Sequence, residues 1–265
     1  MKLFYILILF FFSFCSIQAQ NKAKLIAPLH SHNDYLKDKP LWDALGNGAH
    51  SIEIDVFAYG NELKIAHIKF ALKYRDNLTD FYLKPLLNLV MQDGYFYDNI
   101  PLILMIDFKN NRDTSLNLLL QKIEPYKDYF TFYHNDSVYN RPLQLLISGG
   151  GFSYDAVKNM DSIYVFLDGS VHNCESDFPD KLVPRGSANY NSNFKWKGKG
   201  EMPEDELNKL REMISKAKSC NKELRFYAMP HNENIWTKFL DEGVYWMNID
   251  NNYHFKRFYE KYLNK

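Results

Sequence analysis

Short apolar runs of strand length alternate with longer runs of helical pattern along most of this 265-residue chain. This alternation restricts the fold more than any other feature, because strands that are separated by helices pair in parallel. The expected strands are the apolar runs Leu25–Leu29, Ser51–Phe57, Leu102–Phe108, Leu143–Ser148, Tyr164–Leu167, Lys181–Val183 with its continuation to Ala188, Leu224–Ala228 and Tyr245–Ile249.

The segments between these strands have helical patterns and helical boundaries. Pro203 and the acids that follow it begin one helix well, and Gly243 ends another. Eight strand–helix repeats favour a TIM-type (β/α)8 barrel in the α/β class, formed as a single domain, with an open doubly wound sheet as the alternative. Asn189–Gly200 is polar and is expected to be a loop. The expected helices are Leu41–Leu45, Phe81–Met91, Thr114–Ile123, Tyr154–Asn159, Glu204–Cys220 and Ile235–Asp241.

The first 19 residues have the pattern of a secretory signal peptide. Lys2 precedes an apolar run from Leu3 to Phe14, and Ile17–Ala19 provides a small-residue cleavage site. Cleavage there would leave residues 20–265 as the barrel domain, secreted or periplasmic. A lipid anchor on Cys15 and an uncleaved anchor are the alternatives.

Composition excludes some partners and one kind of metal site. Lysines plus arginines equal aspartates plus glutamates, so no net positive charge favours nucleic acid as a partner. Without the leader, two cysteines remain, Cys174 and Cys220, and an oxidising compartment would permit a disulfide between them. No zinc-type cysteine spacing occurs, so a bound metal should be a hard cation with oxygen ligands.

Polar clusters stand at the ends of the first strand-like runs. They are His30-Ser31-His32-Asn33-Asp34, Glu53-Ile54-Asp55, His67, and Asp107-Phe108-Lys109. Because side chains alternate along a strand, the carboxylates at positions 53 and 55 point to the same face, about 7 Å apart along the chain. The active face of a parallel barrel is formed at the carboxyl ends of its strands, where these clusters should meet.

Each cluster also has a structural interpretation. Glu53 and Asp55 could face solvent or pair with a lysine. Asp107 and Lys109 could be a surface ion pair, and His67 could be a structural histidine. A lone buried carboxylate is costly, which favours a functional site. The other histidines are expected to be structural or exposed: His50, His134, His172, His231 and His254.

The order of these residues resembles the phospholipase C-like phosphodiesterases, and especially the glycerophosphodiesterase-like family named after altered inheritance of mitochondria protein 6. Residues 48–56 are the most similar stretch. The similarity continues through residues 30–35, 81–86, 225–230 and 243–250. It therefore spans nearly the whole chain after the leader.

The resemblance implies a TIM-type barrel that binds one divalent cation, Mg²⁺ or Ca²⁺. Its metal ligands would be Glu53, Asp55, Asp107 and Asn33. His32 and His67 would be the paired acid–base histidines, with His30 as the rival for the first role, and Lys109 would contact the substrate phosphate. The implied function is a phosphoric diester hydrolase.

Three neighbours of these residues differ from the glycerophosphodiesterase pattern and leave the substrate open. No arginine follows the first histidine, Ile68 stands where an acid usually follows the second, and His231 follows Pro230 where an acid is common. The substrate would be a small-molecule or lipid-headgroup phosphodiester, and peripheral contact with a membrane is an open alternative. No protein partner is evident.

Two other functions are compatible with the same residues. One is a non-catalytic secreted barrel that binds a phosphorylated lipid headgroup or a glycan. The other is metal-dependent hydrolysis of a different bond.

Overall fold

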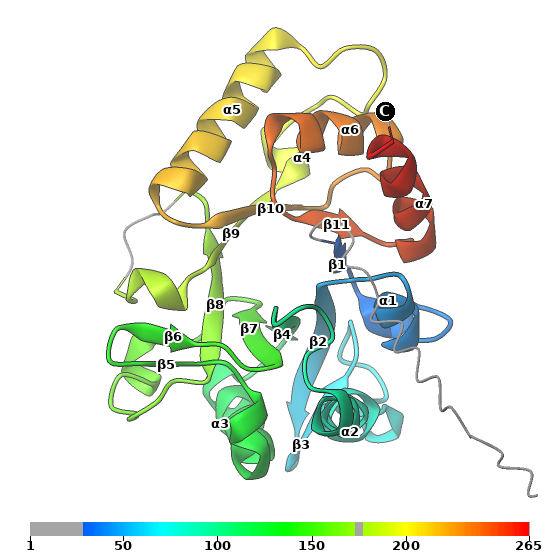
Figure 1. The fold of residues 1–265 in the computed structure, drawn as a ribbon. Coiled ribbons are helices and arrows are strands. Elements are labelled where there is room, and N and C mark those ends of the chain that lie inside the picture. Colours follow the sequence, from blue (N-terminus) through cyan, green and yellow to red (C-terminus); the bar gives the residue numbers. More distant parts are fainter. Residues whose placement is uncertain (1–28, 173–176, 265) are drawn as a thin grey trace, which may run out of the picture.

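Eight parallel strands form the centre of the computed structural model, which describes residues 29–172 and 177–264. Their spatial order is β10-β9-β8-β7-β4-β2-β1-β11. The two ends of this order are joined by a parallel bridge between Arg225 and Trp246, where Trp246 N–H donates to the Leu224 carbonyl at 3.0 Å. The sheet is therefore a nearly closed barrel of the TIM type (Figure 1). The strands are β1 (Leu29–Ser31), β2 (Ser51–Tyr59), β4 (Leu102–Phe108), β7 (Leu143–Ser148), β8 (Val165–Ser170), β9 (Arg185–Asn189), β10 (Glu223–Tyr227) and β11 (Met247–Ile249).

Helices follow most of these strands and cover the outside of the barrel. In Figure 1, α5, α6 and α7 lie together at one side, and α2 and α3 lie at the opposite side. The α-helices are α1 (Trp42–Gly46), α2 (Lys84–Asp93), α3 (Arg112–Ile123), α4 (Tyr190–Asn193), α5 (Glu204–Ser219), α6 (Glu233–Glu242) and α7 (Asn252–Tyr262). The other helical turns are Asp34–Leu36, Leu72–Tyr74, a π-helical Thr79–Leu83, Glu124–Tyr129, Tyr154–Ala156 and Asp180–Leu182. No helix in the described part of the chain is both long enough and apolar enough to cross a bilayer.

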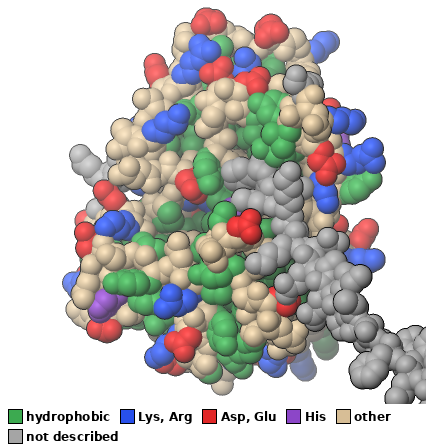
Figure 2. Space-filling model, viewed as in Figure 1, with side chains coloured by type: hydrophobic (Ala, Val, Ile, Leu, Met, Phe, Trp, Pro, Cys, Tyr) green, Lys and Arg blue, Asp and Glu red, His purple; other side chains and the backbone are tan. Residues whose placement is uncertain are grey.

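Charged side chains of both signs are intermixed on the surface. Figure 2 shows acidic and basic groups interspersed over one face of the molecule, with apolar side chains between them. This mixture agrees with the equal numbers of acidic and basic residues in the sequence. A local excess of one sign, where it occurs, is therefore a property of a particular segment.

Most expected elements are present, and two have the expected bounds, β4 and β7. The expected strand at Lys181–Val183 is wrong. A 3-10 turn stands there, and the strand begins only at Arg185, because Pro184 has no N–H to donate to a sheet. The segment Tyr154–Asn159 is likewise one 3-10 turn at its start rather than an α-helix.

Two α-helices were not expected from the sequence. The polar loop over residues 189–200 contains the short helix α4, whose first turn is capped by the Asn189 side chain. The C-terminal helix α7 is rich in aromatic and charged residues, which give only a moderate helical preference. Its stability comes from packing, since Phe255 and Phe258 are buried three residues apart on one face.

The hairpin expected after the second strand is present. Strand β3 (Glu62–Ile65) pairs antiparallel with β2, from Val56 opposite Ile65 to Tyr59 opposite Glu62. The turn therefore brings the chain back to β2, where Ala66 N–H donates to the Asp55 carbonyl at 3.2 Å. A second hairpin, β5 (Phe132–His134) with β6 (Ser137–Tyr139), lies outside the barrel sheet.

Three expectations concern residues whose structure is not described. The signal peptide (residues 1–19) and the first four residues of the first expected strand precede Leu29. The Cys174–Cys220 disulfide would involve Cys174, which lies in the undescribed segment 173–176.

Candidate active site

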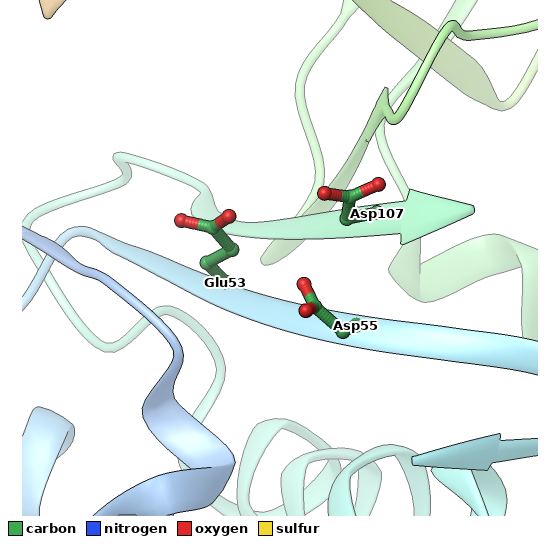
Figure 3. A group of neighbouring side chains, drawn as sticks. All are labelled: Glu53, Asp55 and Asp107. Carbon is green, nitrogen blue, oxygen red and sulfur yellow. The ribbon is translucent and has the colours of Figure 1, made fainter. Parts of the chain in front are cut away.

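The three predicted acidic ligands converge at the carboxyl ends of β2 and β4. The parallel register places Asp55 directly beside Asp107, and Glu53 lies two residues earlier on the same face of β2. One oxygen from each of the three carboxylates can be chosen so that all lie within 4.8 Å of one another. Figure 3 shows the three side chains turned toward a common space.

Two oxygens of this acidic cluster have no hydrogen-bond partner among the described residues. Asp55 Oδ1 and Asp107 Oδ1 are both buried and unpaired, whereas Asp55 Oδ2 has three neighbours. Burial raises the pKa of the Asp107 carboxyl, despite the nearby Lys109 ammonium. Because buried carboxylate oxygens are costly to leave unpaired, the donor set fits a hard divalent cation such as Mg²⁺ or Ca²⁺.

Glu53 is held by a buried network inside the barrel. Its Oε2 lies 2.8 Å from His30 Nε2 and 3.4 Å from Arg225 Nη1. Burial alone would raise the pKa of Glu53, but the contact with His30 and the charge of Arg225 hold it well below its usual range. The carboxylate is therefore kept ionised and fixed in direction.

Both ring nitrogens of His30 are engaged. Its Nδ1 lies 2.8 Å from Ser51 Oγ, and its Nε2 lies 2.7 Å from Arg225 Nη1 in addition to the contact with Glu53. Its exposed fraction is 0%, and burial together with the Arg225 charge lowers its pKa well below the usual value. A second buried arginine, Arg185, donates to the same Ser51 hydroxyl at 3.3 Å.

His32, two residues later, points instead into the open end of the barrel. Its Nδ1 lies 2.6 Å from Asp250 Oδ1, and the other oxygen of that carboxylate lies 2.6 Å from His231 Nε2. Partial burial opposes the charge on Asp250, but the hydrogen bonds from His231 and His32 lower its pKa well below its usual range. The contact of Asp250 with Nδ1 leaves Nε2 of His32 for another partner.

His67 is the second histidine of the site, and it too is held through Nδ1. This atom lies 2.8 Å from Asp55 Oδ2 and 3.4 Å from the Tyr35 hydroxyl. Tyr35 donates to the same Asp55 oxygen at 2.8 Å, and burial beside Asp55 raises its pKa, so it remains a phenol donor. Asp55 thus has one oxygen for the histidine and one that is unpaired.

Lys109 reaches back over the acidic cluster. Its Nζ lies 2.9 Å from Asp55 Oδ2 and 2.9 Å from Asp107 Oδ2. Burial opposes protonation of this amine, yet the ion pairs with both carboxylates raise its pKa. The side chain is therefore a fixed positive charge at the mouth of the site.

All the site residues expected from the sequence, except His30 and Asp55, line one cavity of about 770 Å³. Asn33 is among them, and its backbone is left-handed (φ 47°), which asparagine tolerates better than most residues. Another wall of the cavity is polar and is formed by the ends of β8, β9 and β10. Among its residues are Asp168, Ser170, Ser187, Asn189 and Tyr227.

Gly149 supports the acidic cluster from the end of β7. Its φ is +69°, and a Cβ on it would lie 1.9 Å from Asp107 Oδ1. No other residue type fits this position without moving the carboxylate or the backbone, so the glycine permits the close approach of the loop to the site.

Several groups of this site were missed in the sequence. Asp250 directly follows β11, so it could have been found by the same rule as the earlier clusters, that polar residues at the carboxyl ends of barrel strands form the active face. Arg225 is a charge inside an apolar strand, the same signal that identified Glu53. His231, expected to be structural or exposed, contacts Asp250. Tyr35 gave no local signal, because its role depends only on its distance from Asp55.

Known proteins are similar to this chain in sequence. The AIM6-like phosphodiesterase domain profile matches residues 21–97. The altered inheritance of mitochondria protein 6 homolog of Arthroderma benhamiae is 27% identical over 256 residues, which cover 84% of this chain and 81% of the relative. Altered inheritance of mitochondria protein 6 of Lachancea thermotolerans is 25% identical over 275 residues, which cover 85% of this chain and 64% of the relative.

Solved structures share the barrel at low sequence identity. A glycerophosphodiester phosphodiesterase from Parabacteroides distasonis superposes with a TM-score of 0.55 at 13% identity, covering 91% of this chain and 99% of its own. One from Agrobacterium tumefaciens has a TM-score of 0.51 at 12% identity, covering 89% and 100%. The chain is therefore similar in sequence to the AIM6-like phosphodiesterase domain over residues 21–97 and to altered inheritance of mitochondria protein 6 over most of its length, and it has the barrel fold of the glycerophosphodiester phosphodiesterases.

Proposed function

We propose that this protein is a secreted or periplasmic phosphoric diester hydrolase that depends on one divalent cation and acts on a small-molecule or lipid-headgroup phosphodiester. The observation that carries the proposal is the acidic cluster with its two unpaired oxygens, on Asp55 and Asp107, placed at one cavity with two histidines. Each histidine is held through Nδ1 by an aspartate, which leaves its Nε2 available for proton transfer.

Glu53, Asp55 and Asp107 would hold the cation, with Asn33 as a further oxygen ligand. Mg²⁺ and Ca²⁺ are the candidates, since all of these ligands are oxygens. When bound, the cation would neutralise phosphate charge and make a neighbouring hydroxyl of the substrate more acidic.

His32 is proposed as the general base. With Nδ1 directed to Asp250, its Nε2 can take the proton of the attacking hydroxyl, and the Asp250 carboxylate stabilises the imidazolium that forms. His30, the rival for this role, is less suited to it, because both of its ring nitrogens have partners and it does not line the cavity. The proposed role of His30 is to position Glu53 through their contact.

His67 is proposed as the general acid. As the attacking oxygen forms its bond to phosphorus, the bond from phosphorus to the leaving alcohol oxygen breaks, and that oxygen takes the proton of His67. A neighbouring hydroxyl as nucleophile gives a cyclic phosphodiester. In hydrolysis the roles reverse: His67 takes a proton from water, and His32 returns its proton to the ring oxygen that leaves.

Lys109 is proposed to hold a non-bridging phosphate oxygen. It lies at the cavity wall beside the cluster, and its raised pKa keeps it protonated. A positive charge at this place would stabilise the negative charge that grows on phosphorus-bound oxygens in the transition state.

The test is cation binding measured together with turnover. Titration calorimetry with Mg²⁺ and Ca²⁺ should show one site, and release of alcohol from a panel of phosphodiesters should require the bound cation. Asp107→Asn should weaken both, whereas Asp161→Asn, at an exposed surface position, should change neither. Turnover that is unaffected by chelation would refute the metal-dependent mechanism.

A non-catalytic binding barrel is the second candidate, and the position of Lys109 favours it. The Lys109 ammonium group lies 2.9 Å from both Asp55 and Asp107, so these carboxylates have a positive partner that belongs to the chain itself. In that case inorganic phosphate or a phosphodiester should bind in the cavity with no release of alcohol. Turnover by the wild-type protein would exclude this alternative.

A further inference from the structure

The chain segment that follows β3 is a closed surface loop at the edge of the cavity. We call residues 66–75 the rim loop. Its ends are tied together, since Ile65 N–H donates to the Asp76 carbonyl at 2.9 Å and Lys64 forms an antiparallel bridge with Asn77. The rim loop contains His67, which lines the cavity. What touches this loop is therefore held close to the site.

Two apolar residues anchor the rim loop and three others are largely exposed. Ala66 and Leu72 are buried with Phe57 in a small cluster separate from the main core. Ile68, Phe70 and Tyr74 are 62%, 67% and 83% exposed. Large apolar side chains with this exposure, gathered within seven residues, indicate a surface that another phase or molecule covers.

The charges in the rim loop all have one sign. Lys69, Lys73 and Arg75 alternate with the exposed apolar side chains, and residues 66–75 contain no aspartate or glutamate. The whole chain has a formal net charge of zero, so this concentration of positive charge is local. Apolar side chains that alternate with basic ones match the two layers of an anionic membrane surface, acyl chains below and negative headgroups above.

The geometry points to an anionic lipid surface as the partner of the rim loop. We propose that Ile68 and Phe70 insert at the headgroup boundary, that the Tyr74 ring and the basic side chains of the loop stay at headgroup level, and that the cavity then opens toward the membrane. A lipid surface accepts separate protruding side chains without a complementary shape, which a protein partner would have to provide. This inference goes beyond the proposed hydrolysis and does not rest on it, because the loop would bind lipid without turnover.

The test is co-sedimentation of the full-length protein, freed of any leader, with vesicles of phosphatidylcholine alone and with added phosphatidylserine. Wild-type protein should bind the phosphatidylserine vesicles more tightly, and added salt should weaken that binding. Ile68→Ser with Phe70→Ser should reduce binding by about tenfold or more, from the lost apolar burial. Lys69→Gln with Lys73→Gln should reduce it by about fivefold for each charge removed.

Matched controls distinguish insertion of the rim loop from a general loss of exposed apolar surface and from unfolding. Leu263→Ser removes an equally exposed apolar side chain in another part of the surface, and should leave vesicle binding unchanged. Thermal unfolding should be the same for all variants, because each altered side chain is exposed. Failure of phosphodiester turnover would leave vesicle binding intact, so the two proposals fail separately.

Two outcomes would overturn the proposal. The first is that the wild-type protein binds neither kind of vesicle, or that it binds both kinds equally well and the rim-loop variants bind them as well as the wild type and the control variant do. The second is a concentration-dependent dimer that Phe70→Ser dissociates, which would make the rim loop an interface between two copies of this chain.

Discussion

Replacing Asp250 by Asn tests the proposed role of a contact with His32 that the sequence analysis did not predict. Asp250 Oδ1 lies 2.6 Å from His32 Nδ1, and an asparagine of nearly the same shape keeps the hydrogen bond but removes the charge. The variant should therefore keep the fold and the cavity. It should lose the stabilisation of the imidazolium that forms when His32 takes a proton.

The expected size follows from Coulomb's law and the exposure of the pair. Two unit charges about 4 Å apart attract by about 4 kcal/mol at an effective dielectric constant of 20, and by about 1 kcal/mol in water. The Asp250 side chain is 51% exposed, so a value of about 2 kcal/mol is appropriate. That free energy corresponds to a fall of about 30-fold in kcat. The loss is smaller than the roughly 10⁴-fold loss at the buried triad aspartate of serine proteases.

The assay is steady-state hydrolysis of the best phosphodiester in the panel, with kcat and KM measured separately. The fall should appear in kcat, while KM and cation affinity change little. Nitrogen NMR of the imidazole should show that Nδ1 of His32 carries the proton in the wild type and that this preference weakens in the variant. His231→Asn is the control, since it removes the other neighbour of Asp250 and leaves the contact with His32.

A variant with wild-type kcat would refute the role of Asp250. The same conclusion would follow if His231→Asn reduced kcat as much as Asp250→Asn, because the effect would then belong to the pair of side chains around the carboxylate rather than to its contact with His32.

Three further predictions concern other parts of the molecule. His67→Ala should abolish turnover of alkyl phosphodiesters but retain measurable turnover of nitrophenyl esters, whose leaving group needs no proton; equal losses with both would contradict the general-acid role. Gly149→Ala should weaken cation binding, measured by calorimetry, and should destabilise the fold by about 1–3 kcal/mol, because Gly149 has a positive φ and lies close to Asp107. The control is Gly60→Ala, which also has a positive φ but has open space around it and should not affect cation binding. Burial lowers the pKa of His50 to about 4, so between pH 6.5 and 4 the unfolded chain binds a proton that the folded protein excludes, and stability falls as the pH falls through this window. His50→Gln should remove roughly 3 kcal/mol of that fall in denaturant unfolding measured across the window, and an unchanged pH profile would contradict the prediction.

The strands and the acidic cluster could be predicted because their signals are local. Alternation along β2 places Glu53 and Asp55 on one face whatever the rest of the chain does, and the apolar runs of β4 and β7 have clear ends. The shifted start of β9 was decided by a proline, which is also a local effect. The missed helix α7 depended instead on packing of its aromatic face, which has no strong local signal.

The partners of these residues could not be predicted in the same way. His30 and His32 are two residues apart and chemically identical, so only the barrel decides that one is buried against Arg225 and the other faces Asp250. These contacts join residues separated by 195 and 218 positions. No periodicity in the sequence extends over such a separation.

By itself, the sequence determined which chemical groups stand at the strand ends and therefore what kind of reaction the site could support. The tertiary structure decided which of these groups meet: the two unpaired carboxylate oxygens, the aspartate that contacts each histidine, and the rim loop at the edge of the cavity. The physical reason is that side-chain direction along a strand follows from local backbone geometry, whereas contact across a barrel follows from the register and closure of the whole sheet.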